Sequence, residues 1–122
     1  MRTTDLMIGD WIEINHNSRK VKVTAVFNNL IDTTSVSPIM GDEVSPIFLT
    51  HEMLRANGFE IHNEVNGYIL PTSKAHAFKL SWDKMFCDLY WNAARIRYVH
   101  ELQHALRLCG LTELADNFKV EE

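Results

Sequence analysis

YVHELQHALRLCG, residues 98–110 of the 122-residue chain, is the stretch that decides how the C-terminal part of the protein packs. At 100° per residue its apolar side chains gather on one face of a helix, and these are Tyr98, Val99, Leu102, Ala105, Leu106 and Cys109. Gly110 predicts the helix end, because glycine readily takes the left-handed conformation that closes a helix. The start has two solutions: Asn92 caps the helix, or RIRY (95–98) is one more strand and the helix begins near Tyr98. In both cases the apolar stripe predicts a helix that covers a sheet.

The same stretch contains HELQH, a match to the H-E-x-x-H pattern, in which two histidines bind zinc and the glutamate acts as general base. His100 and His104 fall at about 40° and 80° around the helix, opposite the apolar stripe near 240°, so both are expected to face outward. Arg97 and Arg107 flank them, and their charge would repel a divalent cation. Glu101 follows Arg97 by four residues, a spacing that favours an ordinary surface ion pair.

A catalytic zinc also needs a third protein ligand. The extended pattern H-E-x-x-H-x-x-G-x-x-H requires glycine where this chain has Arg107 and histidine where it has Gly110. Glu113 follows Gly110 too closely to reach back to the histidines. We therefore predict no catalytic residue, no metal ligand and no cofactor. The alternative is a zinc-dependent hydrolase, with His100 and His104 as ligands and Glu101 as the base that activates a metal-bound water.

His100 and Gln103 lie near one margin of the apolar stripe. Polar side chains at the boundary between a helix and a sheet usually satisfy buried backbone groups. We expect these two to hydrogen-bond the backbone of a neighbouring sheet or turn.

The N-terminal third reads as short strands. IGDWIEI (8–14) places Ile8, Asp10, Ile12 and Ile14 on one side, and KVKVTAVF (20–27) alternates Val21, Val23, Ala25 and Phe27 with polar residues. NN at 28–29 is a turn signal, and LIDTTSV (30–36) follows as a third strand. A meander of this kind resembles a small SH3-type barrel, over about forty residues.

The middle of the chain predicts a short helix and an antiparallel sheet. Thr50 is a good helix N-cap, and Gly58 suits the position after the helix, with Phe59 folding back on Leu54. FEIH and YILP flank an Asn66-Gly67 turn, and AFKLSW and FCDLYW give further strands of a three- or four-stranded sheet. The fold expected is one α+β domain spanning residues 1–122.

Composition restricts the function classes. The net charge is −4, with scattered lysines and arginines, so nothing in it favours binding to nucleic acid. No apolar run is long enough to span a bilayer, and the N-terminus lacks the apolar segment of a signal peptide. The expected location is therefore the cytoplasm, without membrane attachment. Cys87 and Cys109 are then expected to be reduced and buried.

Tyr90 and Trp91 are adjacent in a predicted strand, so their side chains point to opposite faces of the sheet. One of them must meet solvent, a covering element or a partner. Because tyrosine and tryptophan are enriched in interface hot spots, this pair is the candidate interaction site.

Two segments carry a family resemblance. SPIFLTHEMLRANGFEI (45–61) and IRYVHELQHALRLCGL (96–111) resemble signature stretches of small, uncharacterised bacterial and prophage-type proteins, which read I-P-L-T-x-E-x-L-x-x-x-G-F and Y-V-H-x-L-Q. The shared V-H-x-L-Q does not require Glu101 or His104, so the resemblance implies that the zinc pattern is coincidental. It implies no known activity. The function expected is that of a non-enzymatic interaction or accessory protein of the kind that phages and mobile elements encode. Its partner is expected to be a protein, with a second copy of the chain as one candidate.

Overall fold

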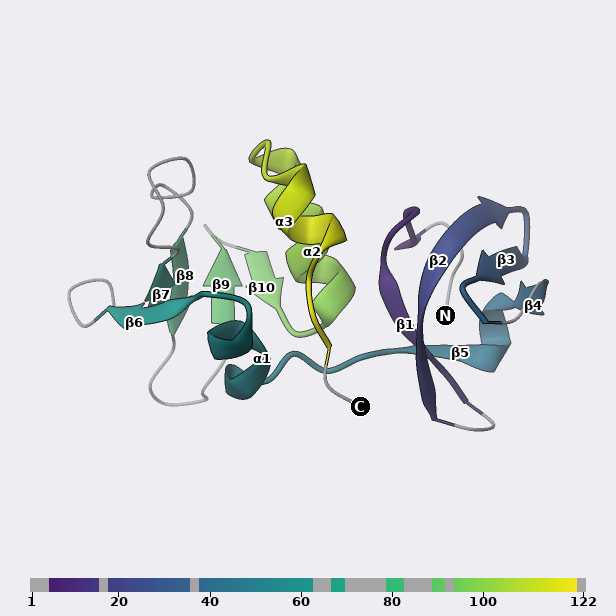
Figure 1. Cartoon of the computed structure of the whole chain (residues 1–122), viewed down its shortest axis with the longest axis horizontal. Coiled ribbons are helices and arrows are strands. Elements are labelled where there is room, and N and C mark those ends of the chain that lie inside the picture. The colour runs from purple at the N-terminus through teal and green to yellow at the C-terminus, as the bar shows by residue number, and fades with distance from the viewer. Residues whose placement is uncertain are drawn as a thin grey trace.

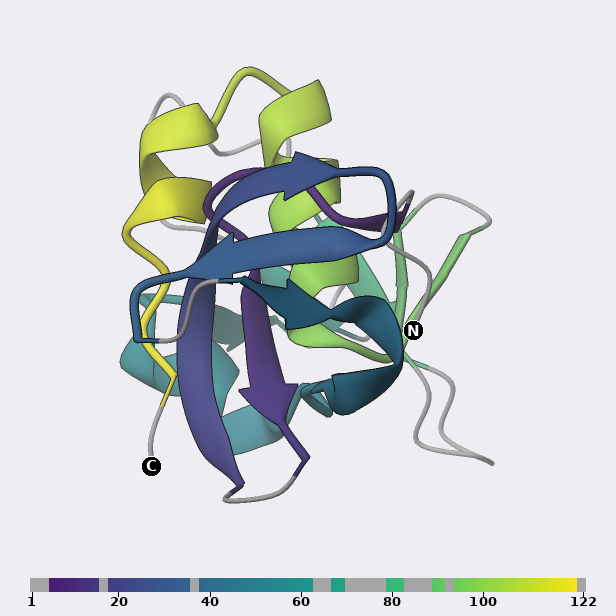
Figure 2. The same cartoon turned by 90° about the vertical axis from the view of Figure 1, so that its right-hand side faces the viewer.

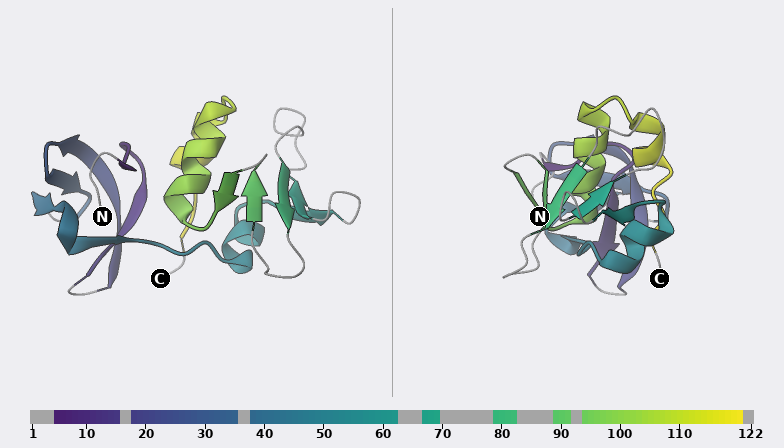
Figure 3. Two further views of the ribbon diagram at one scale, coloured as in Figure 1. Left: turned by 180° about the vertical axis from the view of Figure 1, so that it is seen from behind. Right: turned by 90° about the vertical axis from the view of Figure 1, so that its left-hand side faces the viewer.

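The computed structural model describes residues 5–15, 18–35, 38–62, 67–69, 79–82, 89–91 and 94–120. They form a mixed α+β structure with two antiparallel sheets of five strands each. The N-terminal sheet lies to the right in Figure 1, the second sheet lies to the left, and helices α2 (Val99–Leu108) and α3 (Thr112–Asp116) stand between them. The views from the other sides show the same separation of the two sheets by the C-terminal helices (Figure 3).

The first sheet has the strand order β4-β3-β2-β1-β5. Its strands are β1 (Trp11–Ile14), β2 (Arg19–Phe27), β3 (Leu30–Thr33), β4 (Ile39–Met40) and β5 (Val44–Pro46). A 3-10 turn, Gly41–Glu43, connects the last two strands. Figure 2 looks onto this sheet. The meander expected from the sequence is confirmed, but its described strands form an open sheet with β4 and β5 at the edges, so they do not form a closed barrel.

The alternation predicted for this sheet holds for its central residues. Its core is formed by Leu6, Ile12, Ile14, Val21, Val23, Ile31, Ile39 and Val44. Phe27, expected to point inward, is 49% exposed. The reason is a register shift between Val23 and Ala25, which reverses the faces beyond it and turns Val26 to the core. Ile8 was also expected inward and is 67% exposed, because β1 begins only at Trp11.

The second sheet has the order β10-β9-β8-β7-β6. Its strands are β6 (Glu60–His62), β7 (Gly67–Ile69), β8 (Lys79–Trp82), β9 (Leu89–Trp91) and β10 (Ala94–Ile96). The fifth strand is β10, so the structure selects the second solution for the C-terminal helix, which begins at Val99 with Tyr98 as its N-cap. Asn66 and Cys87 lie outside the described residues.

The helix ends follow the sequence signals. Helix α1 (His51–Ala56) begins where the Thr50 hydroxyl accepts a hydrogen bond from the Met53 N–H. Beyond it Gly58 has φ +90°, and the Phe59 N–H donates to the Leu54 carbonyl. The same closure recurs after α2, where Gly110 has φ +77° and the Leu111 N–H donates to the Leu106 carbonyl. These predicted termini are confirmed.

Helix α2 covers the second sheet, as expected. Its buried Val99, Leu102, Ala105 and Leu106 share one apolar core with Tyr68, Leu80, Leu89 and Ile96 of the strands. The prediction that Cys109 is buried is wrong. The helix proper stops at Leu108, and Cys109, as the C-cap, is exposed.

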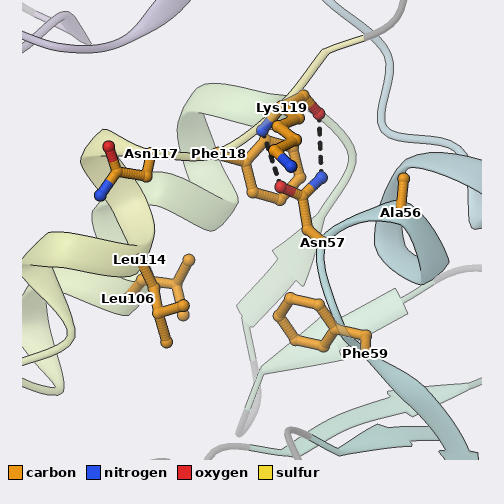
Figure 4. Close-up of a pocket in the computed structure, with 8 residues that line it drawn as sticks. All are labelled: Ala56, Asn57, Phe59, Leu106, Leu114, Asn117, Phe118 and Lys119. Carbon is orange, nitrogen blue, oxygen red and sulfur yellow. Dashed lines mark hydrogen bonds between the residues drawn. The ribbon is translucent and has the colours of Figure 1, made fainter.

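The C-terminal segment runs back along α1 and is held by one amide side chain. Asn57 Nδ2 donates to the Lys119 carbonyl at 2.9 Å, and Asn57 Oδ1 accepts from the Lys119 N–H at 2.7 Å. Figure 4 shows this pair beside a small hollow of about 200 Å³. These bonds fix the neighbouring Phe118 in the apolar core that α2 shares with the second sheet, called the second core below. None of the helices in the described part of the chain is long and apolar enough to cross a membrane.

Candidate functional site

The two apolar cores meet at a polar junction centred on Asp10, just before β1. Its side chain is fully buried. Oδ2 accepts from the Met7 N–H at 2.8 Å and from His104 Nε2 at 2.6 Å, and Oδ1 accepts from Arg107 Nη1 at 2.6 Å. A buried carboxylate is tolerated only when it is paired in this way. Two residues on the polar side of α2, His104 and Arg107, are therefore bound to the segment that precedes β1.

Gln103 is the second connection across the junction and is also fully buried. Its Oε1 accepts from the Trp11 N–H at 3.0 Å, while Nε2 donates to the carbonyls of Gly9 and Ala115, both at 2.9 Å. One amide thus joins α2 to two other segments of backbone, residues 9–11 and the end of α3. The expectation that Gln103 satisfies backbone groups is confirmed.

Trp11 completes the junction from the side of the first sheet. Its ring packs against the second core, and its indole N–H donates to the Phe118 carbonyl at 2.7 Å. Lys22 Nζ lies 5.3 Å from the centre of the ring and donates to the Asp116 carbonyl at 2.7 Å. These contacts tie β1 and β2 to the C-terminal end of the chain.

Glu101, the glutamate of HELQH, has a backbone role. Its Oε1 accepts from the N–H groups of Arg97 and Tyr98, at 2.9 and 3.0 Å, and so caps the start of α2. The ion pair expected with the Arg97 guanidinium is not among the described contacts. That group instead lies over the Tyr98 ring, 5.8 Å from its centre. Both N–H groups lie just before the first turn of the helix, and Glu101 satisfies them from within that turn.

His100 departs most from the sequence expectation. It was predicted to face outward, and it is only 7% exposed. The expectation that it bonds the backbone also fails, since Nδ1 is sealed from solvent with no hydrogen-bond partner in the described structure. The ring stacks on Tyr98, with centroids 5.8 Å apart, and meets His104 edge-on at 5.6 Å. Burial lowers the pKa of His100, so the imidazole is held neutral.

The HELQH geometry differs from that of a zinc enzyme. His104 Nε2 is committed to Asp10, and Glu101 Oε1 is committed to two backbone groups. Within the described ranges, no set of three His, Cys, Asp or Glu side chains is placed to hold a metal ion. Two imidazoles do lie side by side, but each is oriented by the fold rather than toward a shared ion.

A cleft of about 630 Å³ opens beside the two histidines. Two apolar side chains and five polar or aromatic ones line it, the latter being Asp5, Tyr98, His100, Glu101 and His104. The imidazole of His104 is fixed here because Asp10 holds its Nε2–H.

Tyr90 and Trp91 lie in β9 and are both half-buried. Trp91 packs against the second core, on the same face as the buried Leu89. Tyr90 therefore points to the opposite face of the sheet, where it pairs in register with Arg95 and Ser81.

An exposed apolar cluster on the first sheet was not expected from the sequence. Phe27, Leu30 and Met40 are paired in register across β2, β3 and β4, so they share one face of the first sheet. Phe27 and Met40 are 49% and 48% exposed. The register shift that turned Phe27 outward created this cluster, and no periodicity in the sequence indicates it.

No protein-family model matches the chain, and no curated protein or solved structure shows detectable similarity to it.

Proposed function

We propose that the protein is a non-enzymatic accessory protein that acts by binding another protein. The observation that supports this most is the use of the HELQH side chains within the fold. Glu101 caps a helix, Gln103 joins α2 to two other backbone segments and His104 pairs with buried Asp10. Side chains engaged in this way stabilise the structure, and the described residues include no three His, Cys, Asp or Glu side chains placed to hold a metal ion.

The rival function is a zinc hydrolase, and one variant separates the two. Glutamine is as suitable as glutamate at the third position of a capping box, so Glu101→Gln keeps the cap but removes a general base. Zinc content and hydrolysis of peptide and ester substrates should be measured on protein purified without a histidine tag, together with Glu101→Gln and His104→Ala. Under this proposal, hydrolysis is at background in all three, and zinc is far below one ion per chain. Stoichiometric zinc that is lost in His104→Ala, with activity lost in Glu101→Gln, would establish the enzyme instead.

The contact with a protein partner is proposed at outward-facing aromatic and apolar side chains of the two sheets. Tyr90 is the outward member of the Tyr90–Trp91 pair. The Phe27–Leu30–Met40 cluster offers apolar side chains paired in register, and exposed apolar patches mark interaction sites. An SH3-like character of the first sheet and an origin in a prophage belong to the same proposal, and they rest on strand order and on the two signature segments.

A second copy of the chain is the partner to test first. Size-exclusion chromatography with light scattering should show dimers whose population rises with concentration. Phe27→Ser should shift the population to monomers, whereas Phe48→Ser, at a residue 68% exposed but outside the cluster, should not. Tyr90→Ala tests the other surface in the same assay. A monomer at all concentrations for the unmodified chain would rule out self-association and leave a different protein as the partner.

A further inference from the structure

The side chain of Asn57, the C-cap of α1, holds the C-terminal residues 118–120, which we call the strap. Its Nδ2 donates to the carbonyl of Met53 at 2.7 Å and to that of Lys119 at 2.9 Å. Its Oδ1 accepts from the Lys119 N–H at 2.7 Å (Figure 4). The two carbonyls need N–H donors and the N–H needs an acceptor, so a neutral amide fits this place and a carboxylate does not.

Asn57 is followed by Gly58, and an asparagine before a glycine is open to a chemical change. The backbone nitrogen of the following residue can attack the side-chain carbonyl carbon of asparagine, and glycine has no Cβ to hinder the approach. Gly58 is exposed, and a Cβ built on it would meet no atom within 4 Å beyond its chain neighbours. The surroundings of Gly58 therefore leave room for the attack.

The reaction is a deamidation, and its atoms balance without an oxidant or a reductant. The Gly58 nitrogen forms a bond to Asn57 Cγ, the Cγ–Nδ2 bond breaks, and Nδ2 leaves as ammonia with the proton that the Gly58 nitrogen loses. Water then adds to the cyclic imide and opens it at either carbonyl, which gives aspartate or isoaspartate. The net change consumes one water and replaces a neutral amide with a carboxylate.

Both reacting groups are engaged while the strap is closed. The Gly58 N–H donates to the Arg55 carbonyl at 3.2 Å, and the Asn57 amide makes its three hydrogen bonds to Met53 and Lys119. The attack makes Asn57 Cγ tetrahedral and expels Nδ2, so these bonds are given up during the reaction. Deamidation is therefore expected from molecules in which the strap has opened locally.

From this arrangement we propose that Asn57–Gly58 is a deamidation site that the strap protects, and that deamidation releases the strap irreversibly. The new carboxylate still accepts from the Lys119 N–H but has no donor for the carbonyls of Met53 and Lys119. It also places a negative charge at the C-terminal end of α1, where the helix dipole is unfavourable to it. The loss of two hydrogen bonds raises the open fraction of the strap on the order of tenfold.

Release of the strap reaches the junction between the two cores. Phe118 belongs to the strap, is buried in the second core and accepts a hydrogen bond from the Trp11 indole N–H at its carbonyl. Its departure uncovers Phe59 and Leu106, which line the hollow beside Asn57 (Figure 4). A change at one amide thus weakens the contact between the first sheet and the C-terminal end of the chain.

The kinetics of deamidation test the protection by the strap. Peptide mapping by mass spectrometry follows the change from amide to acid at Asn57 in mildly alkaline buffer, with and without urea. Asn66–Gly67, the other Asn–Gly pair of the sequence, is the internal reference and should react at the same rate as Asn57 in urea. In the folded chain Asn57 should react on the order of tenfold more slowly than in urea. Equal rates with and without urea would overturn the proposal.

Two variants loosen the strap without changing the dipeptide. Trp11→Phe removes the hydrogen bond to the Phe118 carbonyl and keeps an aromatic ring, and Phe118→Leu reduces the apolar contact of the strap. Far-ultraviolet circular dichroism checks that each variant is folded. Deamidation of Asn57 should be faster in each folded variant than in the unmodified chain, and an unchanged rate would show that the strap does not control the site.

The effect of the product is tested with one variant and a matched control. Asn57→Asp should speed hydrogen exchange of the Lys119 amide on the order of tenfold, measured by NMR. Asn117→Asp adds the same charge at the C-cap of α3, where the backbone has φ −98° and ψ 10°, close to the φ −100° and ψ 15° of Asn57. It should leave that exchange unchanged, because the Asn117 side chain holds no part of the strap among the described contacts. Equal exchange in the two variants would overturn the release of the strap. The strap shares no residue with the exposed cluster of the first sheet, so this proposal and the proposed function can fail separately.

Discussion

Replacing Gln103 with leucine is the most direct test of the junction between the two cores. The two side chains are similar in size, so the change removes hydrogen bonds without opening a large cavity. The Trp11 N–H and the Gly9 carbonyl each lose the hydrogen bond that they make with Gln103. The Ala115 carbonyl keeps a hydrogen bond from the N–H of Phe118, at 3.4 Å.

The expected cost follows from the two groups left unpaired. A buried donor or acceptor without a partner costs about 1–3 kcal/mol. The greater apolarity of leucine offsets part of that sum, which leaves a net loss of roughly 2–4 kcal/mol in the free energy of unfolding. This is a large share of the total for a small domain, which is about 5–15 kcal/mol.

Urea unfolding measures this loss, with tryptophan fluorescence and far-ultraviolet circular dichroism as two probes. In the unmodified chain the two probes should give one coincident transition. In Gln103→Leu the midpoint should fall, and the two probes should separate because the junction no longer couples the cores. Leu108→Ala is the control on the same helix, since Leu108 is 78% exposed and surface changes usually stay within about 0.5 kcal/mol. A loss below about 1 kcal/mol for Gln103→Leu would refute the reasoning.

Three further perturbations have expected outcomes. Gly9→Ala and Gly58→Ala both place a side chain at positive φ, +95° and +90°, but only at Gly9 would the new Cβ lie 2.9 Å from Arg107 Nη2. Thermal denaturation should therefore show a larger loss of stability for Gly9→Ala than for Gly58→Ala. Equal losses would contradict the packing described for the junction. The lowered pKa of His100 means that the unfolded chain binds more protons than the folded chain near pH 6, so stability rises with pH there and is lost as the pH falls below about 6.5. Urea titrations from pH 7.5 to 5 should show that the free energy of unfolding depends less steeply on pH in His100→Gln. An unchanged dependence would exclude this histidine as the cause. Thr50→Ala removes the cap of α1 and should cost about 1 kcal/mol, a value that chemical denaturation can check and that a neutral result would refute.

The order of elements was predictable because local signals decide it. Thr50, Gly58 and Gly110 mark helix ends through backbone requirements that do not depend on distant residues. The alternation around Ile12 and Val21 likewise gave the central strands of the first sheet. By contrast, the bulge after Val23 has no signature in the sequence, and it reversed the prediction for Phe27.

The candidate site was harder to predict, because α2 packs on two sides. A single apolar stripe places the helix on one sheet, and on that basis His100 and His104 face outward. In the structure Gln103, His104 and Arg107 of the helix bond to the segment before β1, and both His100 and Gln103 are buried. One signal was present: the strand alternation places Asp10 on the same side as Ile12 and Ile14. A carboxylate on an inward face requires a cationic partner, and Arg107 is that partner.

The indole N–H of Trp11 follows from the junction as a natural reporter. It is bonded to the carbonyl of Phe118, far away in the sequence, so its proton can exchange with deuterated solvent only when the C-terminal segment separates from β1. Exchange at this one position therefore measures how often the two cores part without unfolding. Each of the proposed binding events can then be judged by whether it slows or speeds that opening.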